Sequence, residues 1–375
     1  MSLTNNQQAF FSLVKAGLWE QDVHFSYLES IDLLDVYRIA EEQSVVGLVS
    51  AGLEHIQYVK VPQEMALSFV GTALQLEQRN TAMNAFVAKL IEKLRKEGIY
   101  AILVKGQGIA QCYERPLWRA SGDVDLLLDE TNYKKAYKVL IQYASNVEEE
   151  KKDIRHIGMS IGPWEIELHG TLCGLIRKSV DVVLKEVQND TFSNKEVRLW
   201  NYLGTQIPLP SVDNDIVFVF GHIYQHFFKE GIGLRQICDW CRLLWTYKDE
   251  IDKPLLESRL KRMHLMDIWQ AFAVVAVGYL GMPDNAMPFY DSSDKYKRKA
   301  SGVVELMMEA GNFGRAYNKD YKHKCNFLFS SIAAFSHHTR VAYKHYRLFP
   351  YDSFLGWVQL ISIGVKTRFK RVRYR

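Results

Sequence analysis

The spacing of apolar residues predicts that the first hundred residues are helical. Leu67, Val70 and Leu74 recur at intervals of three and four residues, and the same spacing returns in the stretch 86–94. Such a repeat places apolar side chains on one face of a helix. A basic final turn and then Gly98 follow, which is a common way for a helix to end.

The hydrophobic pattern then changes from helical to strand-like. Four short apolar runs, rich in β-branched or aromatic residues and bounded by turn residues, predict strands at 99–104, 124–128, 154–161 and 164–169. The last two are joined at Gly162-Pro163, which is a turn signal. Helical spacing at about 106–114 and at 130–144 separates the strands, so this part of the chain is a predicted small α/β unit.

Beyond Pro210 the pattern is helical again. A polar start suited to capping precedes an apolar stripe in residues 212–231, and further stretches of the same character follow. We therefore predict an α+β chain, with a small mixed sheet and its helices embedded between mainly helical regions. The predicted divisions are an N-terminal helical region, the α/β domain, a C-terminal helical domain and a basic amphipathic C-terminal segment: 1–95, 96–210, 211–320 and 321–375.

Length and composition agree with a globular protein of more than one core. The chain has 375 residues, of which 48% are hydrophobic and 24% charged, and one hydrophobic core rarely serves so long a chain. Its five cysteines include one close pair, Cys238 and Cys241, whereas a zinc site would need a second pair. We expect both on a helix face, in a protein of the reducing cytoplasm. We also expect neither a signal peptide nor a membrane-spanning segment.

The net charge of +4 is too small to indicate a nucleic-acid-binding protein. Six basic residues are concentrated at the end of the chain, after an apolar stretch that begins near Ser353: Lys366, Arg368, Lys370, Arg371, Arg373 and Arg375. One interpretation is a terminal helix that packs on the body and exposes a solvated basic end. The other is a surface that contacts anionic lipid, at the inner face of a membrane, or another polyanion.

Two aspartates one residue apart, in RASGDVDLLLDE, indicate a metal site. On a strand, Asp123 and Asp125 point to one side while Val124 and Leu126 enter the core. Two adjacent carboxylates both stay ionised only if a cation neutralises them, and Mg²⁺, which binds through one or two carboxylates, meets this need. The alternative is that Asp123 caps a turn and Asp125 pairs with an arginine.

A third carboxylate comes from the segment WEIELHG. Glu165, Glu167 and His169 lie on one face if this segment is a strand, and Glu167 is flanked by apolar residues. A nucleotidyl-transfer centre with two metal ions needs a third carboxylate of this kind. For Glu165 we favour an exposed or salt-bridged position at an edge.

Lys105 and Gly106 follow the first predicted strand and open a helix. A glycine at this place lets the backbone approach a phosphate, and the N-terminus of a helix favours negative charge. Lys105 and Arg119 would add positive charge for a triphosphate. The order of these features is a more specific signal than any one of them: strand, Lys-Gly turn, helix, Asp-x-Asp strand and later Glu strand.

In this order, LVKGQGIAQCYERPLWRASGDVDLLL and the later IELHG resemble the nucleotidyltransferase superfamily with a polymerase-β-like palm. More narrowly, residues 85–245 are similar to a bacterial group of uncharacterised nucleotidyltransferases. The resemblance implies that residues 96–210 form the palm. It also implies that the protein uses Mg²⁺, or Mn²⁺, and ATP or another NTP, and transfers a nucleoside monophosphate to an acceptor hydroxyl of a small molecule or a protein.

The same resemblance implies roles for twelve residues. Three would be catalytic and bind the metal: Asp123, Asp125 and Glu167. Four would bind the nucleotide: Lys105, Gly106, Arg119 and Gly122. Five match other positions of the group and would contact substrate: His156, His169, His226, Arg235 and Asp239. Structural roles are an open alternative for the histidines, and the last two residues are also spaced for a salt bridge within one helix.

The sequence departs from the superfamily at the glycine motif. Lys105-Gly106-Gln107 replaces the usual Gly-Ser or Gly-Gly pair, so the serine that normally contacts the terminal phosphates is missing. The alternative to an enzyme is a catalytically inactive nucleotide- or phosphate-binding module whose basic tail binds a membrane or polyanion. The sequence does not identify the acceptor, the preferred NTP or the oligomeric state.

Overall fold

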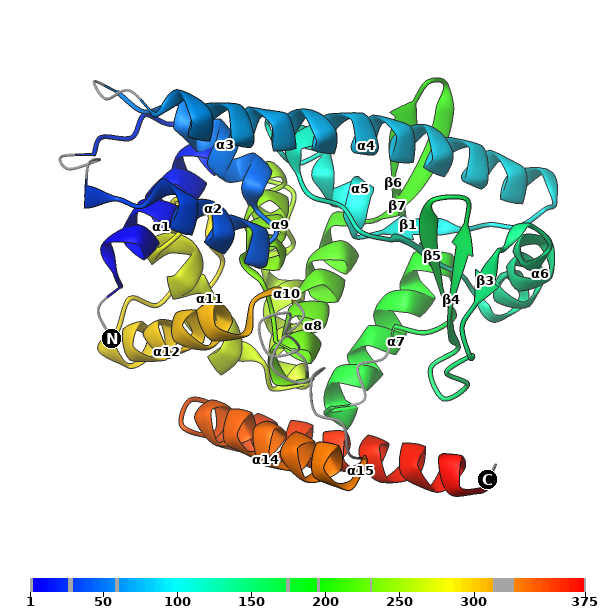
Figure 1. Cartoon of the computed structure of the whole chain (residues 1–375). Coiled ribbons are helices and arrows are strands. Elements are labelled where there is room, and N and C mark those ends of the chain that lie inside the picture. Colours follow the sequence, from blue (N-terminus) through cyan, green and yellow to red (C-terminus); the bar gives the residue numbers. More distant parts are fainter. Residues whose placement is uncertain are drawn as a thin grey trace.

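The described N-terminal part of the chain is helical (Figure 1), with α1 (Asn5–Trp19), α2 (Leu33–Glu42), α3 (Val46–Glu54) and α4 (Gln63–Lys96). The computed structural model describes residues 3–25, 30–57, 61–172, 176–193, 196–229, 231–312 and 327–373. For residues 327–334, 337 and 363–373 it describes the helical backbone and not the side chains. Helices α1 and α3 pack closely through Gly17 and Gly52, where a Cβ atom would collide with a carbonyl oxygen of the facing helix. The long helix α4 runs across one side of the molecule (Figure 1).

A five-stranded mixed sheet follows, in the order β1-β2-β5-β4-β3. Its strands are β1 (Ile102–Val104), β2 (Val124–Leu127), β3 (Asn146–Val147), β4 (His156–Ile161) and β5 (Trp164–His169). Strands β2 and β5 are parallel, and the other neighbours are antiparallel. The register places Asp125 of β2 beside Val104 of β1 and Glu167 of β5. Helices α5 (Gly106–Ala110) and α6 (Glu130–Leu140) follow β1 and β2.

The chain after the sheet is mostly helical, with one two-stranded ribbon. The helices are α7 (Lys178–Ser193), α8 (Val212–Lys229), α9 (Leu234–Thr246), α10 (Lys253–Met263), α11 (Met266–Gly278) and α12 (Asp294–Ala310). The ribbon consists of β6 (Val197–Tyr202) and β7 (Thr205–Pro210) and projects beside α4 (Figure 1).

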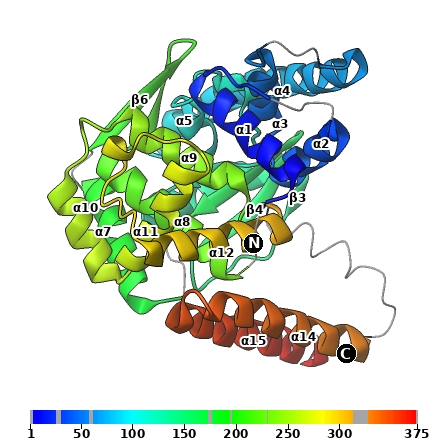
Figure 2. The ribbon, with the colours of Figure 1, turned by 90° about the vertical axis from the view of Figure 1, so that its left-hand side faces the viewer.

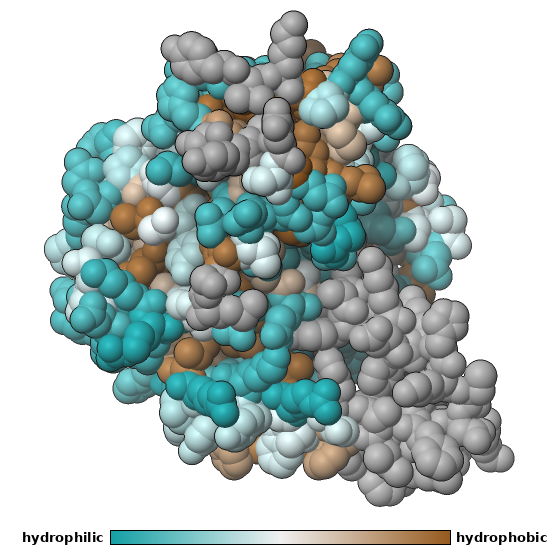
Figure 3. Space-filling model, turned by 60° about the vertical axis from the view of Figure 1, so that its left-hand side comes forward, coloured by the Kyte–Doolittle hydropathy of each residue, from teal (hydrophilic) through white to brown (hydrophobic). Residues whose placement is uncertain are grey.

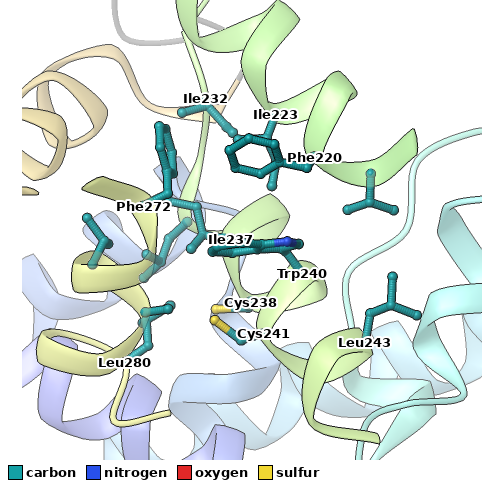
Figure 4. Close-up of a cluster of buried hydrophobic side chains, with 14 of the residues drawn as sticks. Phe220, Ile223, Ile232, Ile237, Cys238, Trp240, Cys241, Leu243, Phe272 and Leu280 are labelled. Carbon is teal, nitrogen blue, oxygen red and sulfur yellow. The ribbon is translucent and has the colours of Figure 1, made fainter. Parts of the chain in front are cut away.

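Two hydrophobic cores hold these elements together. The larger core joins α1–α3 with α7–α12, and the smaller one lies between the sheet, α4, α6 and β7. In the larger core Trp240 packs beside Phe220 and the thiols of Cys238 and Cys241 (Figure 4). Both thiols are free and fully buried, and burial raises the pKa of each. Their place on a buried helix face agrees with the packing role that we predicted.

The C-terminal helices α14 (Phe327–Tyr346) and α15 (Pro350–Arg373) lie side by side as a hairpin against the body (Figures 1 and 2). Asp352 at the start of α15 anchors it, because its Oδ1 accepts hydrogen bonds from Arg177 at 2.7 Å and from Tyr224 at 2.8 Å. Gly356 allows α15 to approach α8, since a Cβ there would lie 3.1 Å from the carbonyl oxygen of Phe228.

The predicted α+β class and the four predicted strands are confirmed. The pattern did not predict α7, β3 or the β6–β7 ribbon. The apolar repeat of Leu67, Val70 and Leu74 does lie in a helix, but all three side chains are exposed. On the face in Figure 3, apolar residues likewise occur in small areas between polar ones. In the described part of the chain no helix has both the length and the apolar character needed to cross a bilayer.

Candidate functional site

Three carboxylates converge where β2 and β5 run side by side. Asp125 and Glu167 are direct partners in the parallel pair, and Asp123 lies one residue before β2 begins. Because side chains alternate along a strand, Ile166 and Leu168 are buried in the core while Glu167 faces the opposite side. One oxygen atom from each of the three carboxylates lies within 4.8 Å of the others.

Lys105 borders these carboxylates from the end of β1. Its ammonium lies 2.7 Å from Asp125 Oδ1, and its side chain is only 14% exposed. Its backbone has a φ of 57°, and Gly106 continues the turn with a φ of 42°. Residues other than glycine are strained in this region of φ. Helix α5 has only five residues, so the side-chain ammonium is the main positive charge that this turn supplies.

Two histidines from β4 and β5 contact the carboxylates. His169 Nε2 lies 2.7 Å from Asp125 Oδ1 and 3.4 Å from Glu167 Oε2. His156 Nε2 lies 3.0 Å from the same Glu167 oxygen. The antiparallel register sets the two histidines opposite each other, and their ring centroids are 4.8 Å apart.

The charged groups of the site shift one another's pKa values in different directions. The charge of Asp125, followed by burial, raises the pKa of Asp123. Burial acts to raise the pKa of Asp125 and Glu167 as well, but Lys105 and the histidines outweigh it and lower both pKa values. Burial acts to lower the pKa of Lys105, and the carboxylates outweigh it and raise that pKa. Asp123 is therefore the carboxylate most in need of a further cation.

Arg119 lies at the edge of the site and is bound by another carboxylate. Its Nε and Nη2 donate to the two oxygens of Asp239 at 2.8 and 2.7 Å, and the side chains of both are largely buried. The hydroxyl of Tyr113 donates to the same carboxylate at 2.7 Å. These contacts attach the loop before β2 to α9.

The predicted salt bridge between Arg235 and Asp239 is wrong, because Asp239 pairs with Arg119 instead. Arg235 Nη1 donates to the carbonyl oxygen of Ala120 at 3.0 Å, and its buried Nε has no hydrogen-bond partner in the described part of the chain. Burial, followed by the charge of Arg119, lowers the pKa of Arg235. An arginine stays protonated at physiological pH all the same. Within the described residues Arg235 is thus a cation with no carboxylate paired to it.

These residues line one cavity of about 380 Å³, a volume within the range of small-molecule sites. All twelve residues that the sequence indicated lie along it: Lys105, Gly106, Arg119, Gly122, Asp123, Asp125, His156, Glu167, His169, His226, Arg235 and Asp239. Segments more than a hundred residues apart in the chain therefore meet at one place.

His222 also lines the cavity, although the sequence did not single it out. It lies one helical turn before His226 on α8, and the two ring centroids are 4.2 Å apart. Burial, followed by the charge of Lys105, lowers the pKa of His222 well below its usual value, so this ring is neutral at physiological pH. The spacing HIYQH was the signal that could have identified it.

A buried polar network holds the loop before β2 in place. Asn80 of α4 donates to the carbonyl oxygens of Leu117 and Arg119 at 2.7 and 2.8 Å, and it accepts from Ser121. Gln107, which follows the Lys-Gly turn, donates to Asn84 Oδ1 at 2.7 Å. The loop before β2 and the start of α5 are thereby both attached to α4. Sequence reasoning missed these residues because it did not show which face of α4 is buried.

The carboxylate cluster fits a divalent ion that prefers oxygen ligands. Asp123, Asp125 and Glu167 each offer one oxygen to a common point. Among the described residues, Asp123 has no cation as close as the Lys105 ammonium is to Asp125. A small group of buried carboxylates of this kind suits Mg²⁺ or Mn²⁺.

The comparisons with known proteins agree with this chemistry. A family model described as uncharacterised nucleotidyltransferase matches residues 29–281. The match includes both the sheet and helix α9, which contributes Arg235 and Asp239. Searches of the curated proteins and of the solved structures gave no significant match.

Proposed function

Because the chain belongs to the family of uncharacterised nucleotidyltransferases, we propose that it transfers a nucleoside monophosphate from an NTP to an acceptor hydroxyl. The observation that carries this proposal is the convergence of Asp123, Asp125 and Glu167 at a cavity that Lys105 and Arg235 also line. A cavity with both anionic and cationic walls suits a ligand that is itself a metal–phosphate complex.

The three carboxylates would hold Mg²⁺, or Mn²⁺ in its place. When bound, such an ion neutralises phosphate charge and favours ionisation of the attacking hydroxyl. The strand register gives Asp125 and Glu167 fixed positions, and the contact to Lys105 keeps Asp125 ionised and ready to act as a ligand.

Lys105 and Arg235 would bind the phosphates of the NTP. This chain has no serine after the turn of β1, and Arg235 is a cation that no carboxylate of the described chain neutralises. Guanidinium groups bind phosphate oxygens in a planar, two-pronged way. Arg119 has a different role, since its contact with Asp239 leaves it to support the loop.

The residues of the chain would thus act by position and charge. They align the α-phosphorus with the hydroxyl and compensate the charge that develops on the leaving pyrophosphate. His156, His169 and His226 lie on the same cavity and are candidates to contact the acceptor. We propose a small-molecule or protein acceptor and a cytoplasmic reaction, which the free, buried thiols of the described chain support.

Transfer of label from an α-labelled NTP tests this proposal. In the presence of Mg²⁺ and fractionated cell extract, the wild-type protein is expected to label an acceptor, beginning with ATP as donor. The double variant Asp123→Asn, Asp125→Asn should lose at least a hundredfold in rate. Glu165→Gln is the matched control, because Glu165 lies on the same strand face but is exposed and accepts hydrogen bonds from Ser160.

Equal labelling by the wild type and the double variant would refute the carboxylate mechanism. Nucleotide binding without any transfer would favour the inactive binding module over an enzyme.

We propose a second property, contact with an anionic membrane surface, on the basis of the C-terminal hairpin. The described residues include seven exposed Tyr or Phe side chains, and five of them lie on or next to this hairpin: Phe335, Tyr343, Tyr346, Tyr351 and Phe354. From residue 353 to the end the sequence has six basic residues and no acidic one. Aromatic and basic residues together favour the interface of a bilayer that contains anionic lipid.

A further inference from the structure

A second group of ligand-type side chains adjoins the three carboxylates. His156, His169 and Glu167 each offer one atom to a common point, and these atoms lie within 4.8 Å of one another. Both imidazoles approach with Nε2, at 3.0 and 3.4 Å from the single oxygen Oε2 of Glu167. This set of two nitrogens and one oxygen differs in kind from the all-oxygen set beside it.

The distances match the spacing of ligands around one small ion. Bonds of about 2.0–2.1 Å from a dication to nitrogen or oxygen, at tetrahedral angles, separate neighbouring ligand atoms by about 3.3 Å. The observed separations of 3.0 and 3.4 Å lie close to this value. Oxygen and nitrogen atoms so arranged need little movement to accept an ion.

The strands hold these side chains rigidly. His156 and His169 are direct partners in the β4–β5 pair, and Glu167 is on the same face of β5 as His169. His156 is only 7% exposed, and its Nδ1 has no hydrogen-bond partner among the residues that the structure describes. The polar contact of this ring is therefore on the Nε2 side, toward Glu167.

Hydrogen bonds account for two of the three imidazole–carboxylate contacts, His169 Nε2 with Asp125 Oδ1 and His156 Nε2 with Glu167 Oε2. A neutral His169 ring has at most one proton on Nε2, yet this atom faces Asp125 Oδ1 and Glu167 Oε2 together. His156 also directs Nε2 to that Glu167 oxygen. The approach of His169 Nε2 to Glu167 Oε2 at 3.4 Å is the contact that neither of these hydrogen bonds explains, and a single dication between the two nitrogens and this oxygen would account for it.

We propose that His156, His169 and Glu167 form a binding site for a first-row transition-metal dication, of the Mn²⁺ to Zn²⁺ series. Imidazole nitrogen favours these ions, and Mg²⁺ prefers oxygen ligands. Glu167 is common to this site and to the carboxylate site, so the two ions would be neighbours in one cavity. The proposal adds to the proposed function but does not depend on turnover, since it concerns metal binding by the protein itself.

Titration with Co²⁺ in saturating Mg²⁺ tests the proposal by visible absorption. Ligation by two imidazoles is expected to give a strong ligand-field spectrum that Mg²⁺ does not displace. His156→Gln and His169→Gln should each weaken Co²⁺ binding more than tenfold. His222→Gln is the matched control, because His222 lines the same cavity but is not in the ligand group, and it should bind Co²⁺ like the wild type.

Thermal unfolding of each variant verifies that the protein is folded. The proposal is overturned if the wild type gives no such spectrum in Mg²⁺, or if folded His156→Gln and His169→Gln variants both retain it. Asp123→Asn separates this result from the proposed function, because it removes a ligand of the oxygen site alone. It should abolish transfer of label and leave the Co²⁺ spectrum in place.

Discussion

Asp125 is the most buried of the three carboxylates of the site. Lys105 and His169 each lie 2.7 Å from its Oδ1, and it is 2% exposed. The alternation of side chains on a strand predicted that Asp123 and Asp125 point to one side, and the resemblance added Glu167 from a second strand. The pairing of Arg119 with Asp239 could not be predicted, since the two residues are 120 positions apart and meet only through the fold.

The strained backbone of Lys105 leads to a prediction about two substitutions. Lys105→Gly and Lys105→Ala remove the same ammonium, but only glycine adopts the φ of 57° without strain. The glycine variant should therefore be more stable than the alanine variant by about 1 kcal/mol. Chemical denaturation of both variants measures the difference, and a more stable alanine variant would contradict the strain.

The two arginines at the site should respond differently to removal of charge. Arg119→Gln leaves Asp239 buried without its cation, so the free energy of unfolding should fall by about 3 kcal/mol. Arg235→Gln removes a cation that has no carboxylate partner in the described chain, so stability should be kept. NTP binding to Arg235→Gln should weaken about tenfold, the worth of one charged hydrogen bond to phosphate.

Denaturation and nucleotide-binding measurements on both variants check this contrast. Destabilisation by Arg235→Gln, with unchanged affinity for NTP, would assign Arg235 a structural role instead.

At the scale of elements, the periodicity of apolar residues predicted helices and strands better than it predicted which side chains are buried. The repeat of Leu67, Val70 and Leu74 lies in α4 but faces solvent, and the buried face of α4 carries polar Asn80 and Asn84 as well as apolar residues. Strand β7 was missed because Pro208 and Pro210 argue against a strand. The ribbon tolerates them because β7 pairs only with β6, which leaves its other edge free of ladder bonds.

The contact between α11 and α12 predicts how the stability of the protein depends on pH. Burial acts to raise the pKa of Asp267 on α11, but Lys295 and Lys299 of α12 outweigh it and lower the pKa below its usual 3.8. Because the folded state has the lower pKa, this contact stabilises the protein above pH 3.8 and is lost as the pH falls through the folded pKa.

Asp267→Asn should accordingly lower the free energy of unfolding at neutral pH by about 0.5–1 kcal/mol, a range set by partial exposure of the pair. The difference from the wild type should shrink as the pH falls below about 4. Thermal unfolding across this range measures it. The exposed Asp249→Asn serves as control and should show no effect, and a difference that grew at low pH would contradict the assignment.

At the scale of the whole molecule, the site depends on both cores. The sheet that carries the carboxylates packs on the smaller core, while Arg235, Asp239 and His226 come from helices of the larger one. Local pattern predicted each segment, and the resemblance indicated that they act together. Pattern alone does not show that they meet at one cavity, because their contacts are long-range in the sequence.

The hairpin of α14 and α15 gives a prediction for the intact protein. Wild-type protein should sediment with vesicles of phosphatidylserine and phosphatidylcholine but not with phosphatidylcholine alone, and added salt should weaken binding. Removal of residues 363–375 should reduce binding more than tenfold, at about 1 kcal/mol per basic residue near the surface. Phe354→Ser should also reduce it.

Tyr143→Ser is the matched control, because Tyr143 is an aromatic residue of similar exposure remote from the hairpin in sequence. Equal binding to charged and neutral vesicles, or full binding by the truncated protein, would refute the membrane surface.

The fate of the individual phosphates of the NTP tests the central claim most directly. With Mg²⁺ and a labelled acceptor fraction, α-label should pass to the acceptor while γ-label leaves in pyrophosphate, and Asp123→Asn should abolish both events together. Transfer of γ-label to the acceptor, or release of γ-label as single phosphate, would show a different reaction and contradict nucleotidyl transfer at this site.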